Sequence, residues 1–119
     1  MLARLESPLS EIISSLLVKE QPTIAWNELA SVGVVVAAEG YPNQYKTNLP
    51  LPEMSGETIY YAGVTRSEQA LVSAGGRIFL AEATASTLEE ARKKVYQTLD
   101  NYSFPGMYYR KDIGVKGLI

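Results

Sequence analysis

Two adjacent cations near the end of the chain, Arg110 and Lys111, are the residues whose types and spacing best suit binding chemistry. They stand in an otherwise apolar segment that is bracketed by Gly106 and Gly114, and Asp112 follows them directly. Arginine offers a planar fork that matches a phosphate group, and lysine offers a compact point charge. The pair therefore suggests a phosphate site. The alternative is that both cations only pair with Asp112 or with a carboxylate elsewhere, and the spacing alone favours this alternative.

Composition excludes several other kinds of site. The 119 residues include no cysteine and no histidine, which excludes a thiol nucleophile, an imidazole base, a disulfide and the usual zinc sites. With 11 basic and 13 acidic side chains the net charge is −2, so nothing indicates a nucleic-acid or membrane partner. The longest apolar run, Val32–Ala38, is far shorter than the roughly 20 residues that span a bilayer. We expect a soluble, cytoplasmic, globular chain without catalytic machinery of its own.

Three further patterns have structural explanations. Gly75-Gly76 lacks the spacing of a phosphate-binding loop and is more typical of a hairpin turn. The adjacent carboxylates Glu89-Glu90 would point about 100° apart on a helix, so they do not share a site. Tyr60-Tyr61 would face opposite sides of a strand, so we expect one of the two rings in the core.

The elements that must position the cation pair are strands in the middle of the chain. The apolar, β-branched stretch Ser31–Glu39 predicts a central strand that is covered on both faces. Thr58–Val64 predicts a second strand. Gln69–Ser73 and Arg77–Ala85 flank Ala74–Gly76, which predicts a β-hairpin. Together these patterns predict an α+β fold with a mostly antiparallel sheet of four or five strands.

Two helices are predicted around these strands. The first begins at Pro8 with Ser7 as its cap, and its apolar stripe over Leu9–Leu17 needs a partner surface. The second is longer, and Ser86–Glu89 fits a capping box in which the Ser86 hydroxyl accepts the Glu89 amide. The charged residues of this helix lie largely away from its inner face. The inner face consists of small and aliphatic residues, namely Leu88, Ala91, Val95 and Leu99.

Six stretches resemble, in the same order, the C-terminal region of the phosphoribosylamine–glycine ligase (glycinamide ribonucleotide synthetase) family. The most specific are the strand followed by EGYP and the final FPGMYYRKDIG. The resemblance extends over nearly the whole chain, through Leu2–Leu9, Ser31–Tyr45, Tyr60–Val64, Ser73–Leu80, Ser86–Ala91 and Tyr102–Gly114.

The departures from the family pattern are modest. The family usually has Asn where Ala74 stands, Thr where Val64 stands and an aromatic residue where Val115 stands. Ala81–Ala85 lacks a glycine that the family has before the helix. We interpret these as packing changes, because none of them removes either cation.

The resemblance implies an ATP-grasp enzyme that joins glycine to 5-phosphoribosylamine in purine biosynthesis and uses ATP and Mg²⁺. Members of the family are several times longer than this chain, and their nucleotide and metal sites lie upstream. We therefore expect a fragment that is inactive alone: residues 1–20 as the last helix of the ATP-grasp domain, and residues 21–119 as a rudimentary single-hybrid-motif-like C-terminal domain.

The resemblance also assigns roles at the cation pair. Arg110 and Lys111 would grip the 5′-phosphate of phosphoribosylamine, Asp112 would orient Arg110, and Gly106 and Gly114 would allow close backbone approach. It implies no catalytic, cofactor-binding or metal-binding residue in this chain. The implied partners are phosphoribosylamine, glycine and the rest of the ligase.

A different class of function remains open. The unpartnered stripe over Leu9–Leu17 suits a non-catalytic module that self-associates or docks on a separate ATP-grasp chain. A biotinyl or lipoyl carrier is a third, weaker interpretation, and we discard it because the sequence has no Met-Lys-Met-like lysine on a hairpin.

Overall fold

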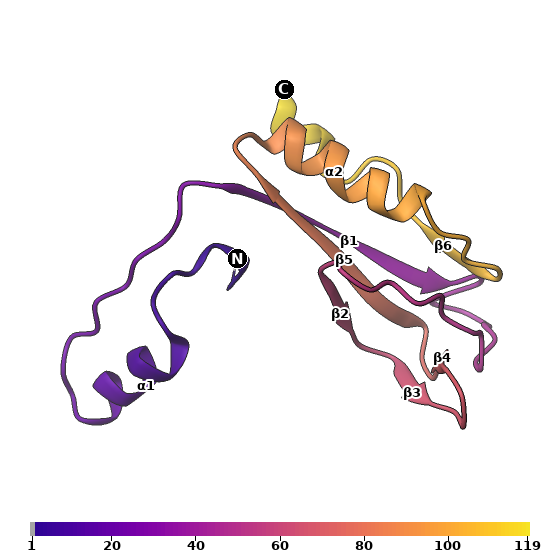
Figure 1. Ribbon diagram of the computed structural model, residues 1–119, viewed down its shortest axis with the longest axis horizontal. Helices are drawn as coiled ribbons and strands as arrows, with labels where there is room; N and C mark the ends of the chain where they lie inside the picture. The colour runs from indigo at the N-terminus through magenta and orange to yellow at the C-terminus, as the bar shows by residue number, and fades with distance from the viewer. Residues whose placement is uncertain (1) are drawn as a thin grey trace.

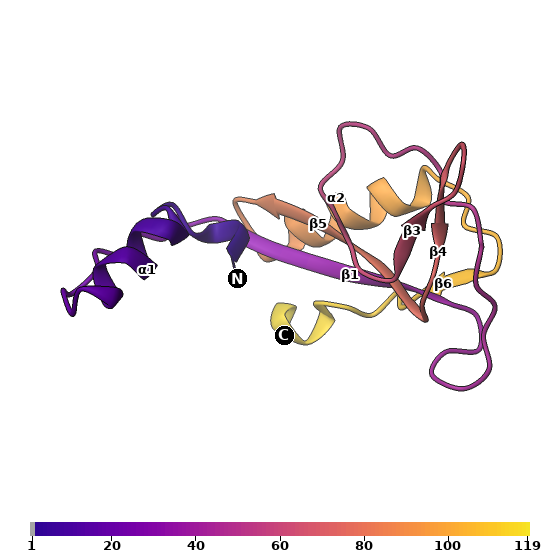
Figure 2. The same cartoon turned by 90° about the horizontal axis from the view of Figure 1, so that it is seen from below.

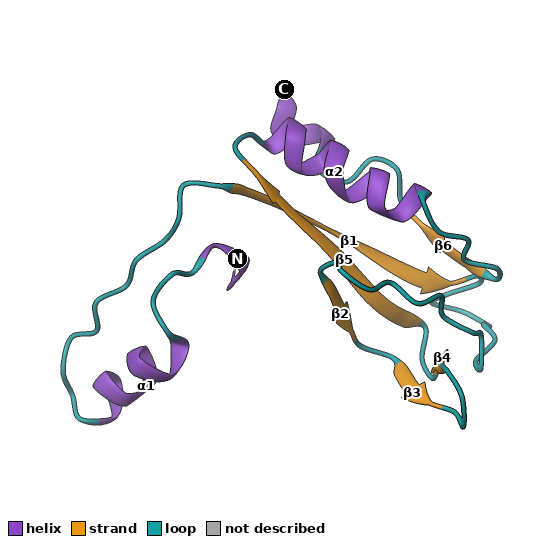
Figure 3. Cartoon of the chain, in the orientation of Figure 1, coloured by secondary structure: helices purple, strands orange, loops and turns teal. Residues whose placement is uncertain are grey.

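The computed structural model describes residues 2–119 as a sheet with one long helix on it and an N-terminal arm (Figure 1; Figure 3). The α+β prediction is confirmed. The elements are, in chain order, the 3₁₀ helix η1 (Leu2–Arg4), α1 (Leu9–Leu17), β1 (Ala30–Ala38), β2 (Ile59–Tyr61), β3 (Val64–Arg66), β4 (Leu71–Ser73), β5 (Arg77–Ala85), α2 (Leu88–Asp100), β6 (Met107–Tyr109) and the 3₁₀ helix η2 (Val115–Leu118).

The main sheet has four strands in the order β2-β5-β1-β6, and every neighbouring pair is antiparallel. β1 and β5 pair along their lengths, with Val34 opposite Ala81. β6 pairs with the end of β1, from Ala38 opposite Met107 to Val36 opposite Tyr109. This short edge strand did not stand out in the sequence, and it places Arg110 directly beyond the end of the pairing.

The core lies between this sheet and α2. Alternate residues of β1 point toward the helix, so Val34 and Val36 are fully buried, as are Val95 and Leu99 of α2. The intervening Val35 faces the other way and is 41% exposed. β1 is therefore central, as predicted, but the expectation that both its faces are covered is wrong. Figure 2 shows α2 on one face of the sheet only.

The predicted hairpin across Ala74–Gly76 is wrong, because β4 pairs with β3 and not with β5. The predicted strand Thr58–Val64 breaks at Gly63. Before this residue, β2 pairs with β5, and after it the chain enters the small two-stranded sheet as β3. A Cβ atom on Gly63 would lie 2.7 Å from the carbonyl oxygen of Arg77 and 2.9 Å from the Cα atom of Gly75. Only glycine permits this crossing of backbones. This contact explains glycine at position 63, whereas a Cβ atom on Gly75 would lie at an ordinary contact distance of 3.4 Å from the Gly63 Cα atom.

The two tyrosines of β2 also differ from expectation. Tyr60 is 53% exposed and Tyr61 is 48% exposed, so neither belongs to the core. β2 is a three-residue strand at the edge of the sheet, and this position leaves both rings about half exposed.

The helix caps are displaced from their predicted positions. The N-cap of α2 is Thr87, whose Oγ1 accepts the Glu90 amide at 3.2 Å, one residue later than the predicted box. Ser86 and Thr87 both have a glutamate three residues on, so the pattern alone does not choose between them. Ser7 does not cap α1: its Oγ accepts the Ala25 amide at 2.8 Å instead.

The arm formed by residues 2–29 projects away from the sheet (Figure 1; Figure 2). In α1 only Ile12 is buried. The remainder of its stripe is exposed, at Leu9, Ile13, Leu16 and Leu17. Neither α1 nor any other helix among residues 2–119 is long and apolar enough to cross a membrane.

Candidate functional site

Arg110 lies immediately beyond β6, and its side chain is held by Asp112. The Arg110 Nε atom donates to Oδ1 at 2.8 Å, and Nη2 donates to Oδ2 at 2.6 Å. Such a two-bond fork fixes the plane of the guanidinium group. The bonds use Nε and Nη2, so the Nη1 end lies outside the fork. Both side chains remain largely exposed, at 69% for Arg110 and 61% for Asp112.

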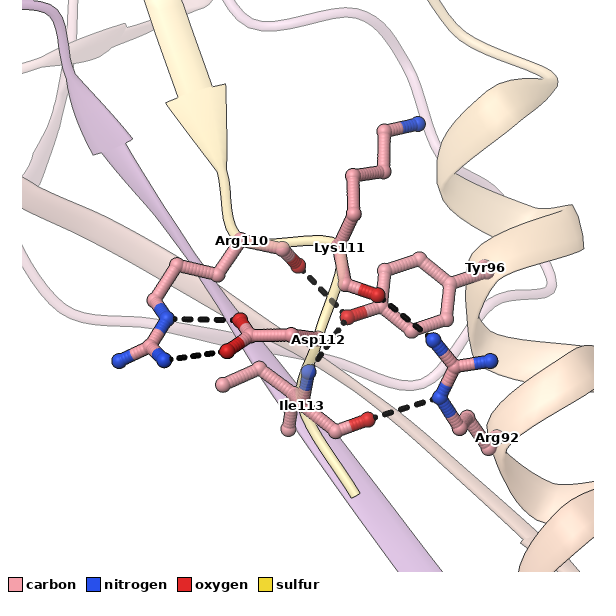
Figure 4. A network of polar contacts seen from close by, with 6 residues as sticks. All are labelled: Arg92, Tyr96, Arg110, Lys111, Asp112 and Ile113. Carbon is pink, nitrogen blue, oxygen red and sulfur yellow. Dashed lines mark hydrogen bonds and ion pairs between the residues drawn. The ribbon is translucent and has the colours of Figure 1, made fainter. Parts of the chain in front are cut away.

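Lys111 leaves the chain in another direction (Figure 4). Its Nζ atom donates to Asp100 Oδ1 at 3.0 Å and to the Tyr109 hydroxyl at 3.3 Å. The same ammonium group lies 4.7 Å from the centre of the Tyr109 ring, and the Tyr109 hydroxyl donates to Asp100 Oδ1 at 2.7 Å. The structure therefore brings Arg110 and Asp112 together, but places the Lys111 ammonium in a separate cluster beside α2.

These contacts shift the protonation equilibria toward the charged forms. The hydrogen bonds from Arg110 hold the pKa of Asp112 below its ordinary value of 3.8. The hydrogen bond from Tyr109, followed by that from Lys111, lowers the pKa of Asp100. The hydrogen bonds to Asp112 and Asp100 raise the pKa values of Arg110 and Lys111, respectively. Both cations are charged at neutral pH, and each is paired with a carboxylate.

Replacing Arg110 by alanine is expected to raise the pKa of Asp112 toward 3.8, because the main cause of its lowering is removed. A carboxylate whose pKa is lowered by folding stabilises the fold at pH values above its ordinary pKa. This contribution disappears as the pH falls through the lowered pKa. The measurement is an NMR pH titration of the aspartate side-chain carbons in the 119-residue chain. The pKa of Asp100 is the internal control. An unchanged pKa of Asp112 would show that the fork does not form in solution.

The two glycines of the predicted site have positive backbone angles, with φ of 74° at Gly106 and 81° at Gly114. Turn geometry therefore accounts for glycine at both positions. Gly106 lies at the far end of β6 from Arg110 and lines a hollow of about 620 Å³ with Glu39 and Lys46. A Cβ atom on Gly114 would touch the side chain of Arg92, 3.6 Å from Cδ. Gly106 is thus apart from the cation pair, and Gly114 is beside the helix that supports it.

Sequence reasoning missed two residues of α2, Arg92 and Tyr96, which bond to the backbone around the cation pair (Figure 4). By sequence, Arg92 belongs with the charged residues that lie away from the inner face of the helix, and no motif marks Tyr96. Their four-residue spacing places them on one side of the helix, next to the inner face. That spacing was the only signal in the sequence.

Metal binding has no candidate among the residues described. Within residues 2–119, no three acidic side chains gather closely enough to hold an ion.

Comparison with known proteins identifies the family to which this fold belongs. The family model described as "Phosphoribosylglycinamide synthetase, C domain" matches residues 31–116, which include the sheet, α2 and the cation pair. The chain belongs to this family. The resemblance to phosphoribosylamine–glycine ligases is thereby confirmed.

Curated relatives extend the match to the N-terminal arm. The chain is 42% identical to the phosphoribosylamine–glycine ligase of Lactococcus lactis over 120 residues, and the match covers 98% of this chain and 29% of that protein. It is also 42% identical to the ligase of Halalkalibacterium halodurans over 121 residues, covering 98% of this chain and 28% of that protein. The chain therefore spans less than a third of the length of these relatives.

A solved structure shares the arrangement of elements. The crystal structure of phosphoribosylamine–glycine ligase from Thermotoga maritima superimposes with a TM-score of 0.76 at 29% identity. The match covers 86% of this chain and 26% of that one. The family's C domain is thus recognisable in both sequence and fold.

Proposed function

We propose that this chain forms the C-terminal domain of a cytoplasmic, ATP-dependent ligase that joins glycine to 5-phosphoribosylamine and makes glycinamide ribonucleotide. Support comes from the family model over residues 31–116 and from relatives that are named phosphoribosylamine–glycine ligase. ATP activates the carboxylate of glycine, and the amine of phosphoribosylamine then displaces phosphate from it. The nucleotide and Mg²⁺ bind residues outside this chain. The chain itself lines the substrate cleft.

The proposal includes a division of the chain. Residues 1–20 belong to the ATP-grasp domain, with α1 as its last helix, and residues 21–119 belong to the C-terminal domain. Two observations support this division. The family's C-domain model begins at residue 31. α1 lies away from the sheet, and most of its apolar residues are exposed (Figure 1). The remaining domains of the ligase would cover these residues.

Phosphate binding is proposed from one observation. Two hydrogen bonds from Arg110 to Asp112 orient a guanidinium group that is exposed and fully charged. In the proposed complex, the free edge of Arg110 binds the 5′-phosphate of phosphoribosylamine and Asp112 orients it. Lys111 provides a second positive charge for the same phosphate. It must first release Asp100, because its ammonium group donates a hydrogen bond to that carboxylate. The proposal also assigns close backbone approach to Gly106 and Gly114, although Leu49 and Arg92 lie where a Cβ atom at these positions would point.

The overall proposal is tested by comparing a full-length ligase that carries this sequence with the isolated chain. Both are supplied with glycine, ATP, Mg²⁺ and freshly prepared phosphoribosylamine, and glycinamide ribonucleotide is measured by mass spectrometry. We expect product only from the full-length protein. No product from a folded full-length protein would refute the ligase function, and product from the isolated chain would refute the division of labour.

A second candidate function follows from the exposed stripe on α1, where Leu9, Ile13, Leu16 and Leu17 are between 47% and 79% exposed. Such a surface suits a non-catalytic module that self-associates. If so, light scattering will show a mass above that of one 13.0 kDa chain, and Leu16→Glu will return it to the monomer. Glu11→Gln, on the same helix, is the matched control. A monomer at all concentrations would argue against association.

A further inference from the structure

Among the residues that the structure describes, no strand pairs with the backbone that carries the cation pair. The pairing of β6 with β1 ends at Tyr109, opposite Val36. Beyond it, side chains of α2 bond to the peptide groups of Arg110, Lys111 and Ile113, as Figure 4 shows. Two side chains of α2 thus supply hydrogen-bond partners that a neighbouring strand would otherwise provide.

Tyr96 connects the two ends of this segment through its hydroxyl group. The hydroxyl donates to the carbonyl oxygen of Arg110 at 2.6 Å and accepts the amide of Ile113 at 3.1 Å. The residue as a whole is buried, at 9% exposure, and both of these bonds are partly buried. One oxygen atom thus closes the turn over the residues on which both cations stand.

Arg92 bonds to the same turn one helical turn earlier. Its Nε donates to the carbonyl oxygen of Ile113 at 3.0 Å, and its Nη2 donates to that of Lys111 at 2.6 Å. Its Cζ atom lies 4.8 Å from the centre of the Tyr96 ring, so the two side chains also stack. A planar fork spans two carbonyl groups, whereas a lysine ammonium at the end of a flexible stem does not fix both.

The helix that presents these two side chains is itself fixed. Ala91, Val95 and Leu99, on the neighbouring face of α2, have no exposed surface and pack in the core. The hydrogen bonds therefore tie the segment after β6 to a rigid element, although that segment lies at an open edge of the sheet. A site is most accurate when its supporting groups are held in this way.

We infer that Arg92 and Tyr96 are positioning residues for phosphate recognition: they hold the backbone of residues 110–113 so that Arg110 meets the phosphate of the substrate. The inference depends on the proposed phosphate site. Neither side chain needs to touch the substrate, because both act through the peptide groups of the segment. Their loss moves the cations without removing a charge from Arg110 or Lys111.

The test uses a full-length ligase with two variants, Tyr96→Phe and Arg92→Ala. Tyr96→Phe keeps the ring and removes the hydroxyl, and Arg92→Ala removes the fork. We expect each to raise KM for phosphoribosylamine by about tenfold, as for the loss of one hydrogen bond, while KM for glycine and for ATP stays unchanged. Arg92→Lys is expected to restore only part of the loss, because it keeps the charge without the fork.

Matched controls come from the same part of the chain. Tyr102→Phe removes a hydroxyl from a tyrosine outside this network, and Lys94→Ala removes a positive charge from the exposed side of α2. A second readout is competitive inhibition by ribose 5-phosphate and by ribose. The variants should weaken inhibition by ribose 5-phosphate about tenfold and leave inhibition by ribose unchanged, since only the former carries the phosphate.

The outcomes separate this inference from the proposal on which it depends. If Arg110→Ala leaves phosphoribosylamine kinetics unchanged, the phosphate site itself is wrong. If Arg110→Ala raises KM but Tyr96→Phe behaves like Tyr102→Phe, the positioning role alone is wrong. A uniform change of all three KM values, or a fall in kcat alone, would also overturn it. Should Arg92→Ala fail to fold, Tyr96→Phe decides the matter.

Discussion

Replacing Arg110 by alanine in a full-length ligase is expected to raise KM for phosphoribosylamine by roughly 10- to 150-fold, with KM for ATP and glycine unchanged. Hydrogen bonds to charged groups contribute about 1.5–3 kcal/mol each, which corresponds to that range of affinity. The exposed guanidinium is oriented by Asp112 through Nε and Nη2, so its loss removes a prepared anion contact. Initial rates at varied phosphoribosylamine provide the measurement.

The control for this prediction is Arg77→Ala, which removes an exposed arginine at the start of β5. Both variants change the net charge equally, so a general electrostatic effect would appear in both. Arg110→Lys is expected to lie between the wild type and Arg110→Ala, because lysine keeps the charge and loses the fork. Unchanged KM and kcat in Arg110→Ala would show that Arg110 does not bind the phosphate.

Replacing Leu99 by alanine is expected to lower the free energy of unfolding by about 2–5 kcal/mol, as is usual when a fully buried leucine leaves a cavity. Leu99 has 0% exposure and belongs to the core between α2 and the sheet. The cost is a large share of the stability of a domain of this size. Denaturant unfolding of the chain, followed by circular dichroism, measures it.

Leu17→Ala is the matched control, since the same side chain is lost from a position that is 79% exposed in α1. Surface substitutions usually change stability by less than about 0.5 kcal/mol. Equal effects of the two variants would contradict the burial of Leu99 described above. A large effect of Leu17→Ala alone would instead indicate that α1 is covered in solution, as the self-association candidate requires.

The features that depend on residues close together in the chain could be predicted from the sequence. The inner face of α2 follows from the spacing of Ala91, Val95 and Leu99, and all three are fully buried. β1 lies within one residue of its predicted bounds, because its apolar, β-branched run has few alternatives. The family was also recognisable, since its motifs are continuous stretches of chain.

Predictions that needed a distant partner were less reliable. The pairing of β4 with β3 depends on the crossing of Gly63 over Gly75, which no local pattern contains. The exposure of Val35 depends on how many layers the fold places on its sheet. Local rules describe a segment, whereas these features arise from contacts between segments far apart in the chain.

The sequence by itself determined the family, the α+β class and the unusual placement of Arg110 and Lys111 in an apolar segment. Only the tertiary structure decided how that segment is held, because the bonds from Arg92 and Tyr96 to it join residues 14 to 21 positions apart. It also decided that the two cations diverge, one toward Asp112 and the other toward Asp100. The physical reason is that residue spacing sets what a helix or strand presents, while packing sets what each side chain meets.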